Sequence, residues 1–362
     1  MKRFLAILLA VSFLLSFASC GKGEDQESEM RIAMVTDYGD VDDHSFNQTT
    51  YEACIAWASE HDAEFTYYRP REDTPAARNT RIEQAIAEGY NIIILPGSSF
   101  TDSVISIASK YPDVKFIALD ASVEQKDATK NVYCAIYHEE LCGYMAGYAA
   151  VSLGYTKLGF IGGKAVPAVV RYGYGFVQGA DAAAKELNKK ITMEFGYSGQ
   201  FYADEKVTAK MDTWYKAGTE VIFTCGGAIW ESVAEAAKAN GGKIIGVDVD
   251  QSEVIDSQYG EGITVTSAMK GIGMTVTATL DKIHAGIWPA IAGHVANLGI
   301  ISGRYPDKNY VGIPIESTQF EEGKFTLDDY RNLVNKMYTG ELLVSNDTSK
   351  LPELTNTTII ED

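Results

Sequence analysis

From Arg31 onward the chain alternates short, wholly apolar runs with amphipathic stretches, and this alternation constrains its fold more than any other feature. Runs that are apolar along their whole length are typical of parallel strands covered by helices on both faces of a sheet. They fall into two successive series. The expected strands of the first are 31–36, 64–68, 91–95, 114–119 and 131–136, and those of the second are 157–162, 191–196, 220–224, 243–247 and 263–268.

The stretches between these runs predict helices. In one of them, Ala77, Ile82 and Ala85 fall near one helical face. The expected helices are 74–88, 99–109, 176–189, 204–217 and 229–239. Two strand–helix series predict an α/β protein with two doubly wound parallel-sheet lobes. The length of 362 residues is enough for about two domains, each with its own core.

The composition excludes two classes of protein. With 46% hydrophobic residues the chain is too apolar to be disordered. Its 49 acidic residues outnumber its 31 basic residues, which gives a net charge of −18 at pH 7. Such a surface repels phosphate backbones, so we expect no nucleic-acid partner.

The N-terminus predicts a signal peptide over residues 1–19. A basic start precedes an apolar run at 4–18, which is too short to span a bilayer comfortably. Small residues before Cys20 resemble a bacterial lipobox, in which the cysteine becomes the lipidated N-terminus. Ordinary secretory cleavage with an incidental cysteine is the alternative. Polar residues 20–29 would then form a flexible linker, and we expect a lipid-anchored protein at the extracytoplasmic face of the cell membrane.

Four cysteines remain, and their spacing matches neither a CxxC pair nor a zinc pattern. They are Cys54, Cys134, Cys142 and Cys225. We expect free buried thiols, with a Cys134–Cys142 disulfide left open for an exported protein. No metal and no cofactor are expected.

Polar residues and glycines follow the expected strands at short distance. Because open α/β sheets bind ligands beyond the carboxyl ends of their strands, these positions are candidates for ligand binding. In the first series they are Asp37, Ser98 and Asp120, and in the second they are Gly227, Asp248 and Lys270.

The loop at 37–47 is the most distinctive stretch. It holds four Asp residues within seven positions, and a helix is expected to begin near Ser45, a residue type suited to N-capping. The spacing does not fit a calcium-binding EF-hand, and four negative charges repel a phosphate. The pattern favours hydrogen-bond acceptors for a neutral polar ligand. Phe46 either faces that ligand or packs into the core as a hydrophobic staple.

This loop resembles the signature of the basic membrane protein family of exported substrate-binding lipoproteins, the purine nucleoside receptor group that serves ABC transporters. Residues 37–47 match the family element D-x-G-x-x-D-D-x-S-F-N. Further similar elements follow in order: FIALD ending at Asp120, PAVVRYGYGFVQGA at 167–180, YSGQFYAD at 197–204, IIGVDVDQ at 244–251 and TSAMKG at 266–271. The chain departs from the family pattern at Tyr172, in CGGAIW at 225–230, and over 296–310.

The resemblance implies a type I periplasmic-binding-protein-like fold, in which a hinge joins the two lobes. The chain would cross between them near Tyr137, Met269 and Tyr310, and 327–342 would be a helix packed on the second lobe. The implied boundaries are 30–136 plus 271–309 for the first lobe and 137–270 plus 310–362 for the second.

The resemblance also implies an aromatic sandwich for a nucleoside base. Phe46 from the first lobe would stack on one face of the base, and Phe201 or Tyr172 from the second lobe on the other. Core packing is the alternative for the latter two rings. Gly227 would allow the backbone to approach the ligand closely.

Polar side chains would hold the edges of the same ligand. Asp120, together with Asp43 or Asn47, would read the base edge, while Asp248 and Lys270 would hold the ribose hydroxyls. For the strand-end carboxylates Asp120 and Asp248, a structural role as helix caps is the alternative.

The expected function is therefore the capture of a nucleoside, with a purine favoured, by a monomer that delivers it to an ABC permease. No GxGxxG follows the first strand and no GxxxxGK[ST] occurs, so neutral nucleosides are favoured over nucleotides. The alternatives are a binder of a pentose or related sugar, and a ligand sensor rather than a transport component. No Ser–His–Asp motif, metal signature or cofactor loop supports an enzyme.

Overall fold

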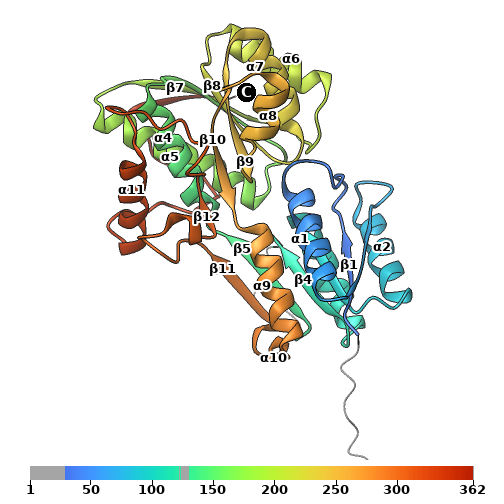
Figure 1. Cartoon of the computed structure of the whole chain (residues 1–362). Coiled ribbons are helices and arrows are strands. Elements are labelled where there is room, and N and C mark those ends of the chain that lie inside the picture. The colour runs from blue at the N-terminus through green and yellow to red at the C-terminus, as the bar shows by residue number, and fades with distance from the viewer. Residues whose placement is uncertain (1–28, 122, 124–129, 362) are drawn as a thin grey trace, which may run out of the picture.

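The computed structural model describes residues 29–121, 123 and 130–361, which fold into two α/β lobes (Figure 1). The expected signal peptide and Cys20 lie outside these residues. Within them, no helix has both the length and the apolar character needed to cross a membrane. The fold class expected from the strand–helix alternation is confirmed, because each lobe is built on its own, mainly parallel sheet.

The first lobe contains a six-stranded parallel sheet in the order β11-β5-β4-β3-β1-β2. Strand β3 is buried along its whole length, as its sequence IIILP predicts, because helices cover both faces. The strands are β1 (Arg31–Val35), β2 (Glu64–Tyr68), β3 (Ile92–Pro96), β4 (Lys115–Leu119), β5 (Val132–Tyr137) and β11 (His294–Leu298). The covering helices are α1 (Phe46–Glu60) and α9 (Ile272–His284) on one face, and α2 (Pro75–Ala87) and α3 (Thr101–Ile107) on the other. 

The second lobe contains a seven-stranded sheet in the order β12-β10-β9-β8-β6-β7-β13, in which only the β12–β10 pair is antiparallel among the described strands. The strands are β6 (Lys157–Gly162), β7 (Ile191–Tyr197), β8 (Val221–Cys225), β9 (Lys243–Asp248), β10 (Thr264–Lys270), β12 (Val311–Gly312) and β13 (Thr357–Glu361). One face carries α4 (Glu139–Leu153), α5 (Pro167–Glu186) and α11 (Leu327–Thr339), and the other α6 (Glu205–Lys216), α7 (Ile229–Asn240) and α8 (Ser252–Tyr259).

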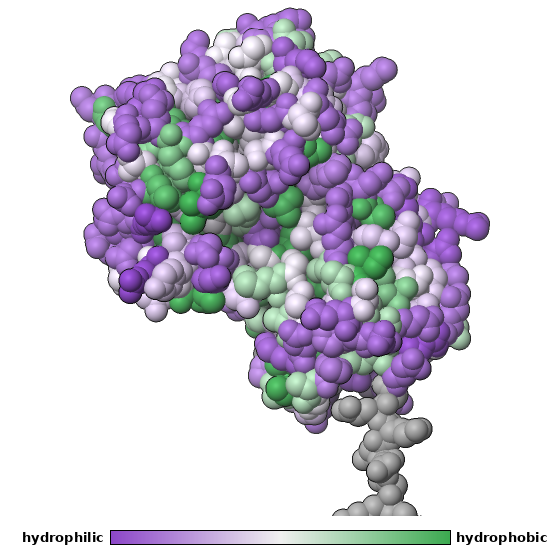
Figure 2. Space-filling model, viewed as in Figure 1, coloured by the Kyte–Doolittle hydropathy of each residue, from purple (hydrophilic) through white to green (hydrophobic). Residues whose placement is uncertain are grey.

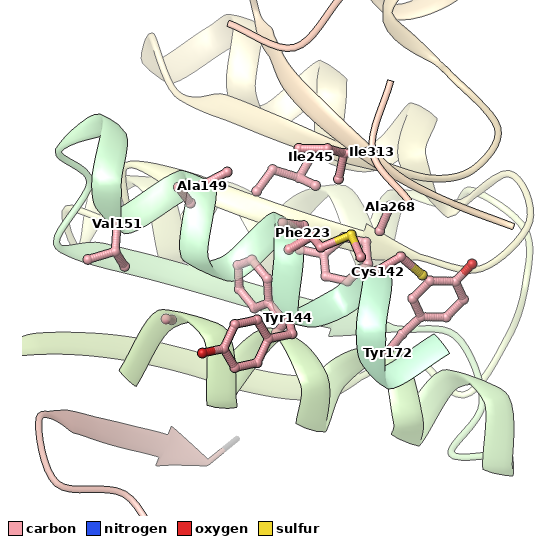
Figure 3. Close-up of a cluster of buried hydrophobic side chains, with 14 of the residues drawn as sticks. Cys142, Tyr144, Ala149, Val151, Tyr172, Phe223, Ile245, Ala268 and Ile313 are labelled. Atoms are coloured by element: carbon pink, nitrogen blue, oxygen red, sulfur yellow. The ribbon is translucent and has the colours of Figure 1, made fainter. Parts of the chain in front are cut away.

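Helices α4 and α5 cross at very short range because glycines face each other there. A Cβ atom at Gly143 would lie 2.3 Å from the Tyr172 carbonyl oxygen, and one at Gly147 only 2.1 Å from another α5 carbonyl oxygen. In the same way, Cβ atoms at Gly175 and Gly179 of α5 would lie 2.2 and 2.0 Å from α4 carbonyl oxygens. No other residue fits at such distances. Figure 3 shows the apolar cluster that α4 and α5 form with β8 and β9.

The chain passes between the two sheets three times, and the crossing segments lie side by side. Strand β5 leads into α4, β10 leads into α9, and β11 leads through a loop into β12 (Figure 1). Main-chain hydrogen bonds join the segments in a row: His138 N–H donates to Leu298 O (2.9 Å), Tyr310 N–H to Gly299 O (3.0 Å) and Gly271 N–H to Tyr310 O (2.8 Å).

The expectation of free buried thiols is confirmed for Cys54, Cys134, Cys142 and Cys225. The Cys134–Cys142 disulfide that the sequence left open is not formed, because Cys134 lies in the core of the first lobe and Cys142 in that of the second. One expectation about local structure is wrong. The helix expected from residue 176 begins at Pro167, since proline at the first helical position has the backbone angle a helix needs.

Candidate ligand-binding site

A cavity lies between the lobes, at the carboxyl ends of both sheets; the space within it, open solvent included, is about 580 Å³. Open α/β sheets bind ligands at this position. The structure brings all eleven candidate residues to its wall: Asp37, Asp43, Phe46, Asn47, Ser98, Asp120, Tyr172, Phe201, Gly227, Asp248 and Lys270. On the face shown in Figure 2, hydrophilic residues predominate on both lobes, and some apolar residues are visible where the lobes meet.

Lys270 ends β10 and is buried in the cavity wall. Its ammonium group lies 2.5 Å from Asp120 Oδ2, 3.5 Å from Asp248 Oδ1 and 3.6 Å from Glu139 Oε1. Burial alone would lower the pKa of this lysine, but the three carboxylates outweigh burial and raise the pKa of Lys270. The lysine therefore stays charged, and it links carboxylates from both lobes.

The strand-end carboxylates Asp120 and Asp248 both have left-handed backbone conformations, with φ of +58° and +66°. Aspartate tolerates this region better than most residues, yet it still costs energy, and such positions cluster at binding sites. Both side chains are almost completely buried. The bend after each strand turns its carboxylate into the space between the lobes.

Asp43, rather than Ser45, caps helix α1. The Asp43 carboxylate accepts hydrogen bonds from the backbone N–H groups of Ser45 (2.9 Å), Asn47 (3.1 Å) and Gln48 (3.0 Å). The Ser45 side chain makes no capping bond, which corrects the expectation from the sequence. Burial raises the pKa of Asp43 to about 6, although the N–H donors oppose the rise. These hydrogen bonds use most of the acceptor capacity of the Asp43 carboxylate.

Two buried oxygen atoms in the cavity wall have no hydrogen-bond partner within the described part of the chain. They are Asn47 Oδ1 and Asp120 Oδ1. The amide nitrogen of Asn47 donates to Asp37 Oδ1 and Asp43 Oδ2, each at 3.2 Å, which fixes the direction of its carbonyl oxygen. Buried acceptors without partners are costly, so a ligand that donates N–H or O–H groups there gains affinity.

The three candidate rings differ in burial. Phe46 and Phe201 are half-buried and line the cavity from opposite lobes. Tyr172 is only 1% exposed, packs edge-on against Phe223 in the second-lobe core, and places its hydroxyl 3.4 Å from Asp248 Oδ1. Phe201 is therefore better placed than Tyr172 to offer a ring face to a ligand.

Glycines around Phe201 make room for it. A Cβ at Gly163 would lie 2.2 Å from the Phe201 ring, and one at Gly226 would lie 2.7 Å from it. Gly227 has φ +51°, and a Cβ there would lie 2.4 Å from the Phe201 carbonyl oxygen. Within the described chain, Gly227 therefore allows the Phe201 main chain to approach closely.

Sequence reasoning missed Glu139 and Arg171. Glu139 begins α4, is completely buried, and accepts a hydrogen bond from Arg171 Nε at 2.6 Å. Burial, with repulsion from Asp120, raises the pKa of Glu139 to about 7 against the pull of Lys270 and Arg171. The available signal was the arginine within PAVVRYGYGF, a cation on an otherwise apolar helix face.

The cavity is acidic overall. Four carboxylate side chains and one ammonium group line it, which disfavours an anionic ligand. Among the described residues, no group of His, Cys, Asp and Glu side chains is arranged to hold a metal ion. The arrangement can stack a flat group and accept several hydrogen bonds.

Comparison with known proteins identifies the family. Residues 30–346 match the family model Bmp, described as ABC transporter substrate-binding protein PnrA-like. The chain belongs to the Bmp family. Bmp family proteins are substrate-binding components of ABC transporters, not enzymes, which implies a small-molecule ligand and a permease partner for this chain.

The relatives agree with this assignment. The chain is 28% identical over 312 residues to "ABC transporter nucleoside-binding protein BmpA" of Lactococcus lactis subsp. cremoris, covering 80% of this chain and 86% of that protein. Its fold is similar to an ABC transporter solute-binding protein from Aeropyrum pernix (TM-score 0.68, 21% identity, 88% of each chain). A solute-binding protein from Conexibacter woesei is also similar (TM-score 0.66, 21% identity, 88% of this chain and 99% of that one).

Proposed function

We propose that this Bmp family protein captures a neutral purine nucleoside. The observation that carries the proposal is a cavity with one half-buried phenyl ring from each lobe, Phe46 and Phe201, beside the unpartnered acceptors Asn47 Oδ1 and Asp120 Oδ1. A purine offers a flat face to each ring, worth ~1–3 kcal/mol per stack, and N–H donors to the acceptors. The nucleoside-binding name of the Lactococcus relative supports the same ligand class.

In this proposal the polar groups divide between base and sugar. Asn47 and Asp120 accept from the base edge, and Asp248 and Lys270 bond to the ribose hydroxyls, with Asp37 and Ser98 at the first-lobe wall. Because Lys270 already pairs with Asp120, the base and ribose contacts are electrostatically linked. Loss of any one group leaves another buried group unpaired, which is how such a site rejects the wrong ligand.

The excess of carboxylates supports a neutral ligand rather than a nucleotide. A phosphate brought into the cavity would meet Asp37, Asp43, Asp120 and Asp248, while the single ammonium group is already neutralised. We therefore propose nucleosides, with their 5′-monophosphates rejected.

We also propose that Cys20 carries a lipid anchor after removal of residues 1–19. The tether from Cys20 to Glu29 would reach at most ~30 Å when fully extended. It would hold the monomer at the extracytoplasmic face of the membrane, close to its permease.

The decisive experiment is mass spectrometry of small molecules released when the purified protein is denatured, followed by thermal shift with added ligands. We expect guanosine, inosine or adenosine to raise Tm, and ribose and GMP to leave it unchanged. At 100 times Kd, a ligand adds about 2.7 kcal/mol to the free energy of unfolding. Stabilisation by ribose or another pentose, but not by nucleosides, would overturn the proposal in favour of a sugar binder. Permease genes beside the coding gene would favour transport over a sensing role.

A further inference from the structure

Two consecutive carbonyl groups of the first lobe accept hydrogen bonds from buried side chains of the second. The indole N–H of Trp230 donates to the Asp43 carbonyl oxygen at 3.0 Å. The side-chain amide of Gln251 donates to the His44 carbonyl oxygen at 2.8 Å. The His44 ring also meets the Trp230 ring edge-on, with centroids 6.0 Å apart.

A third bond follows at the next residue. The Ser45 hydroxyl donates to Asp248 Oδ2 at 2.5 Å. We infer that residues 43–45, with Trp230, Asp248 and Gln251, form a latch that stabilises the closed arrangement of the lobes through protein–protein bonds. Trp230 and Gln251 act within it as positioning residues for ligand affinity.

The latch is largely shielded from solvent: two of its three hydrogen bonds are buried and the Gln251–His44 bond is partly buried. Trp230 is 1% exposed, and Ser45 and Gln251 are fully buried. Removing a donor from a buried pair leaves its acceptor unsatisfied, which corresponds to a change of roughly five- to hundredfold in an equilibrium constant. A second contact between the lobes, the ion pair of Lys164 with Asp73, is about one-third exposed and is expected to matter far less.

Neither Trp230 nor Gln251 lines the ligand cavity. Gln251 is itself held in place, since its Oε1 accepts from Val247 N–H at 2.9 Å. The latch acts on the site through Asp43, whose carboxylate also binds the backbone and amide of Asn47. Closure of the lobes and the positioning of Asn47 are therefore coupled. A larger closed population gives a proportionally lower apparent Kd.

The first arm of the test needs no ligand. Dyes on Glu60→Cys in α1 and Glu235→Cys in α7, both exposed positions, report opening by single-molecule FRET on protein refolded to remove retained small molecules. Trp230→Phe keeps a ring but loses the donor. Gln251→Glu keeps the acceptor for Val247 and, in its ionised form, has no donor for the His44 carbonyl oxygen. We expect the ratio of closed to open molecules to fall roughly five- to hundredfold in each variant, and less than twofold in the control Lys164→Gln.

The second arm measures dissociation of guanosine by stopped flow, and it rests on the proposed function. Dissociation is expected to be faster by a similar factor in Trp230→Phe and Gln251→Glu, with circular dichroism confirming that each variant is folded. A wild type without a measurable closed population, or latch variants matching Lys164→Gln in the FRET arm, would overturn the latch. Failure of guanosine to bind the wild type would count against the proposed function alone, because the FRET arm still decides on the latch.

Discussion

At the scale of single residues, the site depends on one ammonium group among buried carboxylates. Lys270→Met leaves Asp120 and Asp248 buried without a cation, and we expect a loss of about 3–5 kcal/mol in the free energy of unfolding at pH 7, measured with urea. The loss should shrink at pH 5, because Lys270 opposes the rise that burial causes in the pKa of Asp248; without the ammonium group Asp248 takes up a proton more readily, and a neutral carboxyl tolerates burial. The control Lys216→Met removes an exposed pair with Asp212 and should cost only ~0–1 kcal/mol. Equal losses for the two lysines would contradict this reading.

Glu139 predicts a dependence of stability on pH. Its pKa is raised from an ordinary 4.5 to about 7, chiefly by burial, so the fold prefers its neutral form. Between about pH 4.5 and 7 the folded protein binds this proton and the unfolded chain does not; the contribution of Glu139 to stability therefore falls as pH rises through that window. Glu139→Gln cannot ionise, so its stability relative to wild type should improve from pH 4.5 to pH 8 in urea titrations. Parallel curves for wild type and variant, as expected for the exposed control Glu341→Gln, would disprove it.

Phe46 is predicted to contribute a ring face to the ligand. Phe46→Ala should weaken guanosine binding by ~1–3 kcal/mol in calorimetry while the protein remains folded. Phe65→Ala, which removes another half-buried first-lobe ring outside the cavity wall, is the matched control and should leave affinity unchanged. An unchanged affinity for Phe46→Ala would instead place that ring in a packing role.

Some of the site was predictable from the sequence because strand ends and loop letters are local signals. Asp37, Asp120, Asp248 and Lys270 each follow or end an apolar run, and parallel topology brings such ends to one edge. The partner of Ser45 was not predictable, because Asp248 lies 203 positions away and no local pattern pairs them.

At the scale of elements, the glycine crossing of α4 and α5 sets the position of Glu139 and Arg171. Gly147→Ala would place a methyl group 2.1 Å from an α5 carbonyl oxygen, and we expect a loss of about 1–3 kcal/mol in urea unfolding. Gly273→Ala in α9 is the control, since its Cβ would lie no nearer than 3.7 Å to a neighbour. That change should stabilise by ~0.5–1 kcal/mol through helix propensity. If both variants changed the free energy of unfolding in the same direction, helices α4 and α5 would be able to move apart without loss of stability.

Elements with continuous apolar runs were predictable, whereas those stabilised by distant partners were not. Strand β13 pairs with β7 at the edge of its sheet and is largely exposed, so its sequence TTIIE lacks a wholly apolar run. The chain before it is held by Asp181, which accepts from the N–H groups of Thr355, Asn356 and Thr357. These contacts span more than 170 positions of sequence.

At the scale of the whole molecule, the proposed lipid anchor can be tested at Cys20, which lies outside the described residues. Cys20→Ala should abolish labelling with a fatty-acid tracer and shift the protein from the membrane fraction to the medium or wash, because the thiol that accepts the lipid is gone. Cys54→Ala, which removes a buried thiol of the first lobe, should leave labelling unchanged. Persistent labelling of Cys20→Ala would remove the lipoprotein proposal.

The two-lobed arrangement was predictable from two strand–helix series, but the contact between the lobes was not. Trp230 ends the segment CGGAIW, and its partner is a main-chain oxygen 187 positions earlier. Every residue has a main-chain carbonyl group, so the sequence does not indicate which of them accepts a hydrogen bond from a distant side chain.

The three hydrogen-bonded crossings have a mechanical consequence. A single connecting strand would let one lobe rotate about several axes. Three crossing segments joined side by side by hydrogen bonds should bend readily about one axis but resist twisting and sliding past one another. Opening and closing of the lobes should then follow essentially one hinge angle, so residues Asp43–Ser45 approach the second lobe along the same path each time. A relaxation measurement of opening should accordingly fit a single exponential.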